Sequence, residues 1–431
     1  MEDFYALRVK KMFSWFKREH FSFWMICAYL FVEYVRPQSI IPALDILPWA
    51  MVFILLSLIG LLTDPRRKWA SDPANKWMLS FFVVIVLSSF LAYRPDVSYA
   101  KLNSFYTWLI IYFLIINIVY TKERFFVFLA VFIIATFKIS FGLSLVWAKR
   151  GFSFTTWGLQ GPPGFFQNSG ELAIQMAVFF PIAFTVAKHL KPYVSKKIFF
   201  VLALMPVTAA LTILGSSSRG GQIALAAQLV IMFWRRLFNP KILIGAVLAG
   251  AILFALIPPE QKERFSSTGN DRTSQQRLLY WQHGMQMMRE HPGLGVGYFN
   301  FAPYYADHFQ GDMLYEFVEL PHNIFIQVGT DTGFTGLFIF LCLIYRTAKT
   351  NIATARYSKA SGNQGDLYYD LAKSLNVSLW GFVVAGQFVT VTYYPFMWIN
   401  LALTVALHRS VVDVKLPAGQ LSSGPPRAAN T

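Results

Sequence analysis

The stretch from Ile198 to Leu214, IFFVLALMPVTAALTIL, decides the fold because it holds no charged residue over nearly the length of a bilayer span. A transmembrane helix needs about 20 predominantly apolar residues to cross the hydrocarbon core. Charged residues make up only 14% of the 431 residues, against about 25% in a typical soluble domain. The sequence therefore predicts an all-α, polytopic integral membrane protein.

Apolar runs of this kind recur along the chain and predict about twelve transmembrane helices, centred near residues 29, 54, 85, 112, 132, 179, 206, 228, 249, 333, 382 and 402. Helices 1–9 with short loops would occupy residues 1–257, and helices 10–12 would occupy residues 322–412. A long polar loop over 258–321 separates the two groups, and residues 413–431 form a polar tail. A loop this long is usually functional.

The net charge of +16 would suit nucleic acid, but its distribution argues against that partner. With a cytoplasmic amino terminus, most of the 38 Lys and Arg fall in loops on the cytoplasmic side, as the positive-inside rule requires. Both termini are then cytoplasmic, and the 258–321 loop lies on the opposite face. Cys27 and Cys342 both fall in predicted spans, so no disulfide framework or zinc spacing is available. We expect membrane lipids, and no nucleic acid, as partners.

The long loop is predicted to contain an amphipathic helix. Thr273-Ser-Gln-Gln276 offers a capping box, and apolar residues then repeat every three or four positions up to Glu290. His291-Pro-Gly293 ends this helix. Two further irregular polar segments, 149–171 and 215–221, are predicted on the same face, so three polar features converge there.

Three arginines on this face could bind an anion. Arg219 lies in the small-residue turn 215–221, whose backbone N–H groups and hydroxyls could cradle a phosphate. Arg272 and Arg277 lie in the predicted amphipathic helix, where a basic face beside a Met/Trp face suits a helix lying over a lipid-linked anion. The alternatives are an Arg219 that reaches lipid headgroups and helix arginines that are merely solvated.

A histidine at the mouth of the predicted tenth helix is the candidate for proton transfer. His322 follows Pro321 and precedes Asn323, and a titratable imidazole between an aqueous loop and lipid suits that chemistry. The alternative is a helix N-cap or a packing histidine. The other histidines on this face lack metal-ligand spacing and a carboxylate pair, so we expect no metal and no cofactor. Aromatic residues such as Trp281 and Tyr298 could stack on sugars or form an interfacial belt.

Several of these motifs together resemble the signature of the O-antigen ligase and O-antigen polymerase superfamily. The resemblance rests on Arg277-Leu-Leu-Tyr-Trp281, His291-Pro-Gly-Leu-Gly-Val-Gly297, His322-Asn323 and Gly333-Phe-Thr-Gly336. The Ser218-Arg219-Gly220 turn and Gly164-Phe-Phe-Gln-Asn168 are similar to it as well. Arg36-Pro-Gln38 further resembles a subgroup of O-glycosylation ligases, so the acceptor stays open.

The resemblance implies a glycosyltransferase of lipopolysaccharide biosynthesis in the bacterial inner membrane. It would move a glycan from undecaprenyl diphosphate to a hydroxyl of lipid A–core on the periplasmic face, with inversion and without a metal. His322 would be the catalytic histidine, as a general base or a phosphate ligand. Arg219 and Arg277 would bind the diphosphate, with Arg272 as a further candidate. The candidate substrate contacts are Asn168, Trp281, Tyr298 and Asn323.

Other functions with the same residues stay open. An O-antigen polymerase or a protein O-oligosaccharyltransferase would use the same donor with a different acceptor. From a different class, a transporter or flippase would require charged residues deep within spans and broken helices in matched halves. Lys138 is the only obvious cation inside a predicted span, and no halves match.

Overall fold

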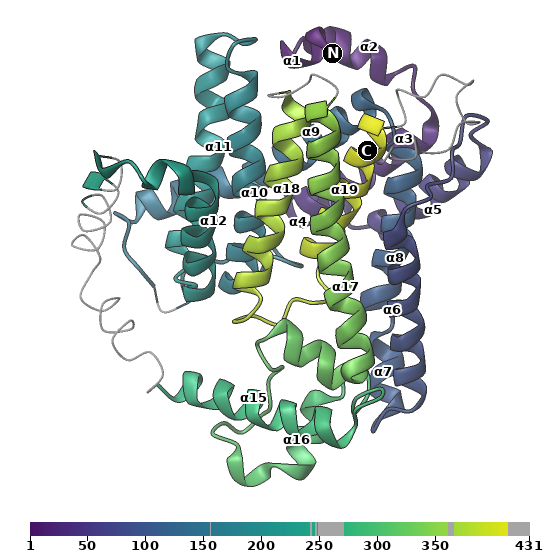
Figure 1. Cartoon of the computed structure of the whole chain (residues 1–431), viewed down its shortest axis with the longest axis vertical. Coiled ribbons are helices and arrows are strands. Elements are labelled where there is room, and N and C mark those ends of the chain that lie inside the picture. Colours follow the sequence, from purple (N-terminus) through teal and green to yellow (C-terminus); the bar gives the residue numbers. More distant parts are fainter. Residues whose placement is uncertain (156, 242–243, 246–247, 249–270, 361–365, 413–431) are drawn as a thin grey trace, which may run out of the picture.

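The computed structural model describes residues 1–155, 157–241, 244–245, 248, 271–360 and 366–412, and every regular element among them is helical. The all-α class is therefore confirmed for this part of the chain. Long helices run nearly parallel to the long axis of the molecule, and the polar segment after residue 270 lies below them (Figure 1). The predicted span near residue 249, the start of the long loop and the 413–431 tail fall largely outside the described residues.

The first half of the chain contains α1 (Glu2–Tyr5), α2 (Val9–Phe16), α3 (Phe21–Val35), α4 (Pro37–Ile40), η1 (Pro42–Leu44), α5 (Trp49–Thr63), α6 (Pro73–Phe90), α7 (Pro95–Lys101), α8 (Asn103–Ile118), α9 (Lys122–Lys149), α10 (Ser169–Leu190), α11 (Lys196–Gly215) and α12 (Arg219–Leu237). The second half contains α15 (Arg272–Glu290), α16 (Phe301–His308), η2 (Gln310–Asp312), α17 (Ile324–Ala360), α18 (Leu367–Ala385) and α19 (Pro395–Val412).

Seven of the described helices are long and apolar enough to cross a membrane. Helices also lie at the other predicted centres within the described residues, but α3 and α5 are short, and α12 and α18 are less apolar or more charged. The membrane character is thus supported, whereas the number twelve is not confirmed. On α5, Met51, Leu55, Ile59 and Leu62 form one exposed apolar stripe. Such a stripe suits contact with lipid and is unfavourable in water.

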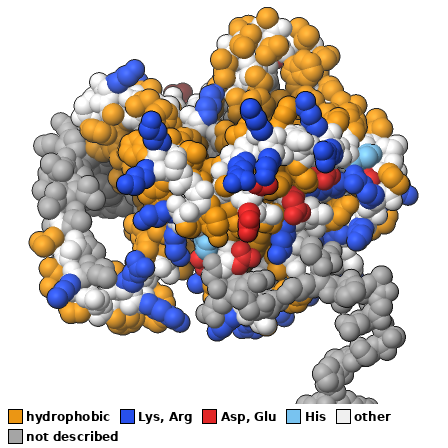
Figure 2. Space-filling model, turned by 90° about the horizontal axis from the view of Figure 1, so that it is seen from above, with side chains coloured by type: hydrophobic (Ala, Val, Ile, Leu, Met, Phe, Trp, Pro, Cys, Tyr) orange, Lys and Arg blue, Asp and Glu red, His pale blue; other side chains and the backbone are white. Residues whose placement is uncertain are grey.

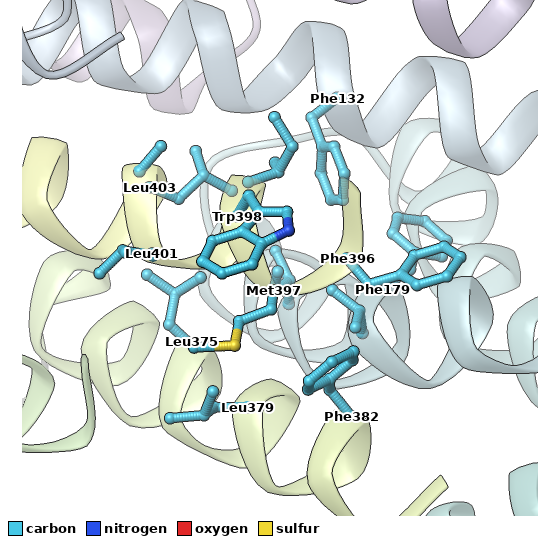
Figure 3. Close-up of a cluster of buried hydrophobic side chains, with 14 of the residues drawn as sticks. Phe132, Phe179, Leu375, Leu379, Phe382, Phe396, Met397, Trp398, Leu401 and Leu403 are labelled. Carbon is cyan, nitrogen blue, oxygen red and sulfur yellow. The ribbon is translucent and has the colours of Figure 1, made fainter. Parts of the chain in front are cut away.

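Two helices, α10 and α19, form the centre of the bundle. Side chains of α10 and α19 are buried over 89% of their most apolar windows, which is typical of helices that are enclosed on all sides. Trp398 on α19 lies among Phe396, Leu401 and residues of α9, α10 and α18 (Figure 3), and its indole Nε1 donates to Thr392 O at 2.9 Å. This core holds in place the end of α18 and the start of α19, which both face the polar segment.

The helix α17 is broken at Gly333, in the middle of the predicted tenth span. Gly333 has φ 67° and ψ −171°, a conformation that is essentially restricted to glycine. The segment 291–297 crosses this break: Val296 N donates to Thr330 O at 2.8 Å, and Phe334 N donates to Pro292 O at 2.9 Å. The break is tolerated because the freed backbone groups find partners inside the protein.

One end of the bundle is rich in basic side chains. Many Lys and Arg, among hydrophobic side chains and a few Asp and Glu, lie on the face near α1, α2 and the end of α19 (Figures 1 and 2). The polar segment with α15 and α16 lies at the opposite end (Figure 1). The cytoplasmic position of the basic face stays a prediction from the positive-inside rule.

Candidate active site

Arg219 is the first residue of α12 and follows directly from the turn after α11. The turn closes because Ser217 takes φ 57° and the Ser218 hydroxyl caps α12 by accepting from Gly221 N at 3.3 Å. A glycine is needed at the second position of α12, since a Cβ atom at Gly220 would lie 2.9 Å from Phe388 Cβ. An arginine at a positive helix end is a favourable place for an anion. In the structure Arg219 Nη1 lies 3.5 Å from Asp271 Oδ2.

The helix α15 carries Arg277, and its N-cap differs from the one that the sequence predicts. The predicted capping box began at Thr273, but the N-cap is Asp271, whose carboxylate accepts from Ser274 N at 3.0 Å and from the Ser274 hydroxyl at 2.7 Å. A carboxylate at this position also interacts favourably with the helix dipole. These hydrogen bonds and the charge of Arg219 hold the pKa of Asp271 below its usual value, against the opposing effect of burial.

Arg277 is half-buried one and a half turns into α15, and no ion pair joins it to another described residue. Its Nε is buried without a hydrogen-bond partner among the described residues. Burial is the main reason why the pKa of Arg277 is lowered; the charge of Arg219 lowers it further, while the charges of Glu319 and Asp271 oppose this change. A buried guanidinium without a direct partner is costly unless an anion binds it.

His322 lies in a strained turn two residues before α17. Its φ is 52°, which is uncommon for a residue other than glycine. Two contacts hold the turn: His322 N donates to the Thr390 hydroxyl at 2.7 Å, and Trp281 Nε1 donates to Pro321 O at 2.8 Å. Asn323 caps α17 by accepting from Phe325 N at 2.9 Å and from Ile326 N at 3.3 Å. The imidazole is therefore not needed as a cap.

Glu319 contacts the imidazole and lies within the electrostatic reach of Arg277. His322 Nε2 lies 2.9 Å from Glu319 Oε2, and His322 Nδ1 is buried without a partner among the described residues. The hydrogen bond to His322 and the charge of Arg277 lower the pKa of Glu319, although burial opposes them. Arg219, Asp271, Arg277, Glu319 and His322 thus form one charged cluster, which we call the Arg–His cluster.

The remaining predicted site residues lie at different distances from this cluster. Arg272 stacks on Tyr315, with its guanidinium carbon 4.6 Å from the ring centre, and donates to Leu314 O. Asn168 is exposed at the start of α10, where its backbone N and its side-chain amide both donate to Glu171 at 3.1 Å. Tyr298 is fully buried against Tyr393 and lies in the protein interior.

Residues 386–394 form the connector between α18 and α19. This connector is a part of the site that the sequence does not predict. Besides Thr390, which accepts from His322 N, Phe388 packs beside Gly220, and Val389 lies next to Gly170 at the start of α10. The connector therefore contacts all of the turns that begin α10, α12 and α17. It lacks charged residues and family motifs, so only the fold shows its role.

Asp271 and Glu319 were missed as well, although weak signals existed. Asp271 directly precedes a basic amphipathic helix, where an acidic cap is expected. Glu319 precedes His322 by three residues with Pro321 between them. Such a spacing indicates a local carboxylate–imidazole pair only when the backbone turn is known.

Comparison with known proteins supports a relation to glycan ligases. Residues 204–341 match a family model described as O-Antigen ligase. A Rickettsia typhi protein named "Putative polysaccharide ligase RT0347" is 24% identical over 271 residues, 60% of each chain. The namesake "Putative polysaccharide ligase RP358" of Rickettsia prowazekii is 25% identical over 199 residues, 44% of this chain and 49% of that protein. The aligned regions thus span about half to three fifths of these relatives. Arg219, Arg277 and His322 all lie within residues 204–341.

Proposed function

We propose that the protein is a glycosyltransferase that uses a glycan linked to undecaprenyl diphosphate. Its resemblance to the O-antigen ligase family over residues 204–341 supports this proposal. The acceptor is a hydroxyl of lipid A–core. Transfer takes place on the periplasmic face of the bacterial inner membrane. The observation that carries this proposal is the Arg–His cluster, in which two guanidinium groups and one imidazole from three different elements lie together.

The arginines would bind the diphosphate of the donor. Arg277 is half-buried and its Nε has no partner among the described residues, so a phosphate oxygen can take a place that no described protein group takes. Arg219 Nη1 lies 3.5 Å from Asp271 Oδ2. Because this contact is long, a more highly charged phosphate can replace Asp271 as the partner of Arg219. As the glycosyl–oxygen bond breaks, its electron pair moves to the leaving diphosphate, and both guanidinium groups stabilise the growing charge.

His322 would act as the general base. Glu319 is a carboxylate at neutral pH because its pKa is lowered by the hydrogen bond to His322 and the charge of Arg277. It therefore accepts a hydrogen bond, and His322 Nε2 at 2.9 Å carries the proton. The lone pair of a neutral imidazole then lies on Nδ1. This nitrogen would take the proton of the acceptor hydroxyl while the hydroxyl oxygen attacks the anomeric carbon from the face opposite to the diphosphate, which inverts that carbon.

The acceptor is the part of the proposal that the cluster constrains least. A second undecaprenyl-linked glycan or a protein hydroxyl would present the same attacking group to His322. Trp281 holds the His322 turn through its indole Nε1 and is only partly buried, so its ring can also contact a sugar of either substrate. Asn168 and Arg272 are the next candidates, at the start of α10 and at the start of α15.

Reconstitution with defined substrates tests this function. Purified protein, undecaprenyl-diphosphate glycan and lipid A–core are incubated in buffer with EDTA, and the product is separated by gel electrophoresis. We expect glycosylated lipid A–core at the same rate with and without the chelator, because arginines rather than a metal neutralise the diphosphate. Parallel reactions without lipid A–core detect polymerisation of the donor. A requirement for a divalent ion, or a product that forms only from donor molecules, would contradict the proposed mechanism or acceptor respectively.

A further inference from the structure

A second charged site lies at the other end of α17, away from the Arg–His cluster. A cavity of about 240 Å³ opens between the last third of α17 and the first half of α18. It is separated from the cluster by more than 20 residues of helix, which corresponds to roughly 30 Å. The end of α17 and the start of α18, which line this cavity, lie at the end of the bundle near α1 and α2 (Figure 1), where the positive-inside pattern predicts the cytoplasm.

Basic side chains form one part of the lining of this cavity. Arg356, Lys359 and Lys373 supply positive charge, and all three are exposed. No carboxylate lines the cavity among the described residues. The nearby acidic residue of α18, Asp370, contacts His189 Nε2 at 2.6 Å and Lys188 Nζ at 3.3 Å instead. The positive charge of the cavity is therefore not neutralised from within the described part of the protein.

Two amide oxygens in the same cavity lack partners. Asn351 is only 1% exposed; its Nδ2 donates to the Thr404 hydroxyl at 3.1 Å, while its Oδ1 has no hydrogen-bond partner among the described residues. The buried Oδ1 of Asn376 is unpaired in the same described set. Leaving such acceptors unsatisfied is unfavourable, so the cavity favours a ligand with hydroxyl donors. Ile352 and Ala355 add an apolar wall.

We propose that this cavity binds the headgroup of an anionic phospholipid that carries hydroxyl groups, such as phosphatidylglycerol. Its phosphate is bound by Arg356 and Lys373, its hydroxyls donate to the two asparagine oxygens, and its acyl chains continue along the apolar side of α17 into the bilayer. Basic pockets between transmembrane helices on the cytoplasmic side are suited to anionic lipid headgroups. This site is independent of the glycan-transfer reaction.

Native mass spectrometry of the full-length protein in detergent tests the proposal with three probes: phosphatidylglycerol, phosphatidylcholine and soluble glycerol phosphate. We expect bound phosphatidylglycerol, little phosphatidylcholine and no glycerol phosphate at equal concentration. The double variant Arg356→Gln/Lys373→Gln should bind phosphatidylglycerol about tenfold to thirtyfold more weakly, given the usual contribution of two basic side chains. Ala355→Phe, which fills the cavity and keeps its charges, should also lose the lipid.

The matched control is Lys196→Gln/Lys197→Gln, which removes the same charge from exposed residues on the same predicted face outside the cavity. This control should retain the lipid. Equal binding by the wild-type protein and the cavity variants would overturn the proposal, and so would an equal loss in the control. Binding of glycerol phosphate as tight as that of the lipid would show a site for soluble phosphates instead.

Discussion

Glu319 is a residue whose role is visible in the structure and not in the sequence. It contacts His322 Nε2 at 2.9 Å and lies within the electrostatic reach of Arg277, so it can orient the imidazole and fix its tautomer. We expect Glu319→Gln to lower the rate of glycan transfer about tenfold, which is less than the roughly 10²–10⁴-fold that the general base itself supplies. The amide retains a hydrogen-bonding group but loses the charge that favours a protonated imidazole.

The pH profile separates this positioning role from a purely structural one. Because the pKa of Glu319 is lowered, its carboxylate stays charged throughout the neutral range, and the wild-type rate should fall under acidic conditions, where this carboxylate gains a proton. Glu319→Gln has no carboxylate to protonate, so the part of this acid-side fall that comes from Glu319 should be missing from its profile. A variant with an unshifted profile and a normal rate would remove Glu319 from the mechanism.

Individual residues show both the reach and the limit of sequence reasoning. Arg219, Arg277 and His322 are identified by polar groups in motifs next to apolar runs, and the structure brings all three into one cluster. Tyr298 looked equivalent in sequence, yet it is fully buried beside Tyr393. Whether an aromatic residue faces a site or the core depends on the packing of distant helices, which the local pattern does not contain.

At the scale of elements, the break in α17 is the feature that places the site. A Cβ atom at Gly333 would lie 2.6 Å from the backbone carbonyl of Gly293, and the φ of 67° is unfavourable for other residues. We expect Gly333→Ala to destabilise the protein by at least about 1–3 kcal/mol, seen as a lower melting temperature in detergent. Transfer activity should fall as well, because the segment 291–297 and the start of α17 would shift.

Gly142 provides the matched control for that substitution. It lies within α9, and no described atom lies within 4 Å of the Cβ that an alanine would add. Gly142→Ala should leave the melting temperature unchanged or raise it, because alanine favours helix by up to about 1 kcal/mol. If both variants melted at the wild-type temperature, the break at Gly333 would not be needed for the fold.

Elements were predicted well where apolar periodicity is strong and poorly where tertiary contacts decide. The predicted amphipathic helix is α15, which ends at Glu290 as predicted. It begins after the Asp271 cap, whereas the prediction began it at Thr273. The glycines of 293–297 and Gly333 looked like separate motifs. The structure shows that they are two sides of one backbone contact, which no reading of either motif alone could show.

At the scale of the whole molecule, the membrane topology is open to a direct test. Starting from a protein without Cys27 and Cys342, single cysteines replace Leu278 on α15 and Tyr193 between α10 and α11, both of which are more than 50% exposed. A membrane-impermeant maleimide applied to intact spheroplasts should label position 278 and not position 193. After permeabilisation both should react. Labelling of position 193 in intact cells would place the basic face outside and refute the topology.

The class of the molecule follows from composition, whereas its number of spans does not. Charged content and long apolar runs are sufficient to predict an all-helical membrane protein. Counting spans is harder, because the short α3 and the two-charge α18 bury most of their side chains against neighbouring helices. Their burial inside the protein, not their hydropathy, determines where they lie.

The central claim is that Arg277 binds the donor while His322 carries out the proton transfer. Donor affinity and transfer rate, measured on the same purified proteins, separate these roles, with Arg289→Ala at the exposed end of α15 as a control that should change neither. We predict that Arg277→Ala weakens donor binding about 30-fold or more. His322→Ala should bind the donor normally but transfer glycan about 10²–10⁴ times more slowly. Normal transfer by His322→Ala, or normal donor binding by Arg277→Ala, would contradict the account.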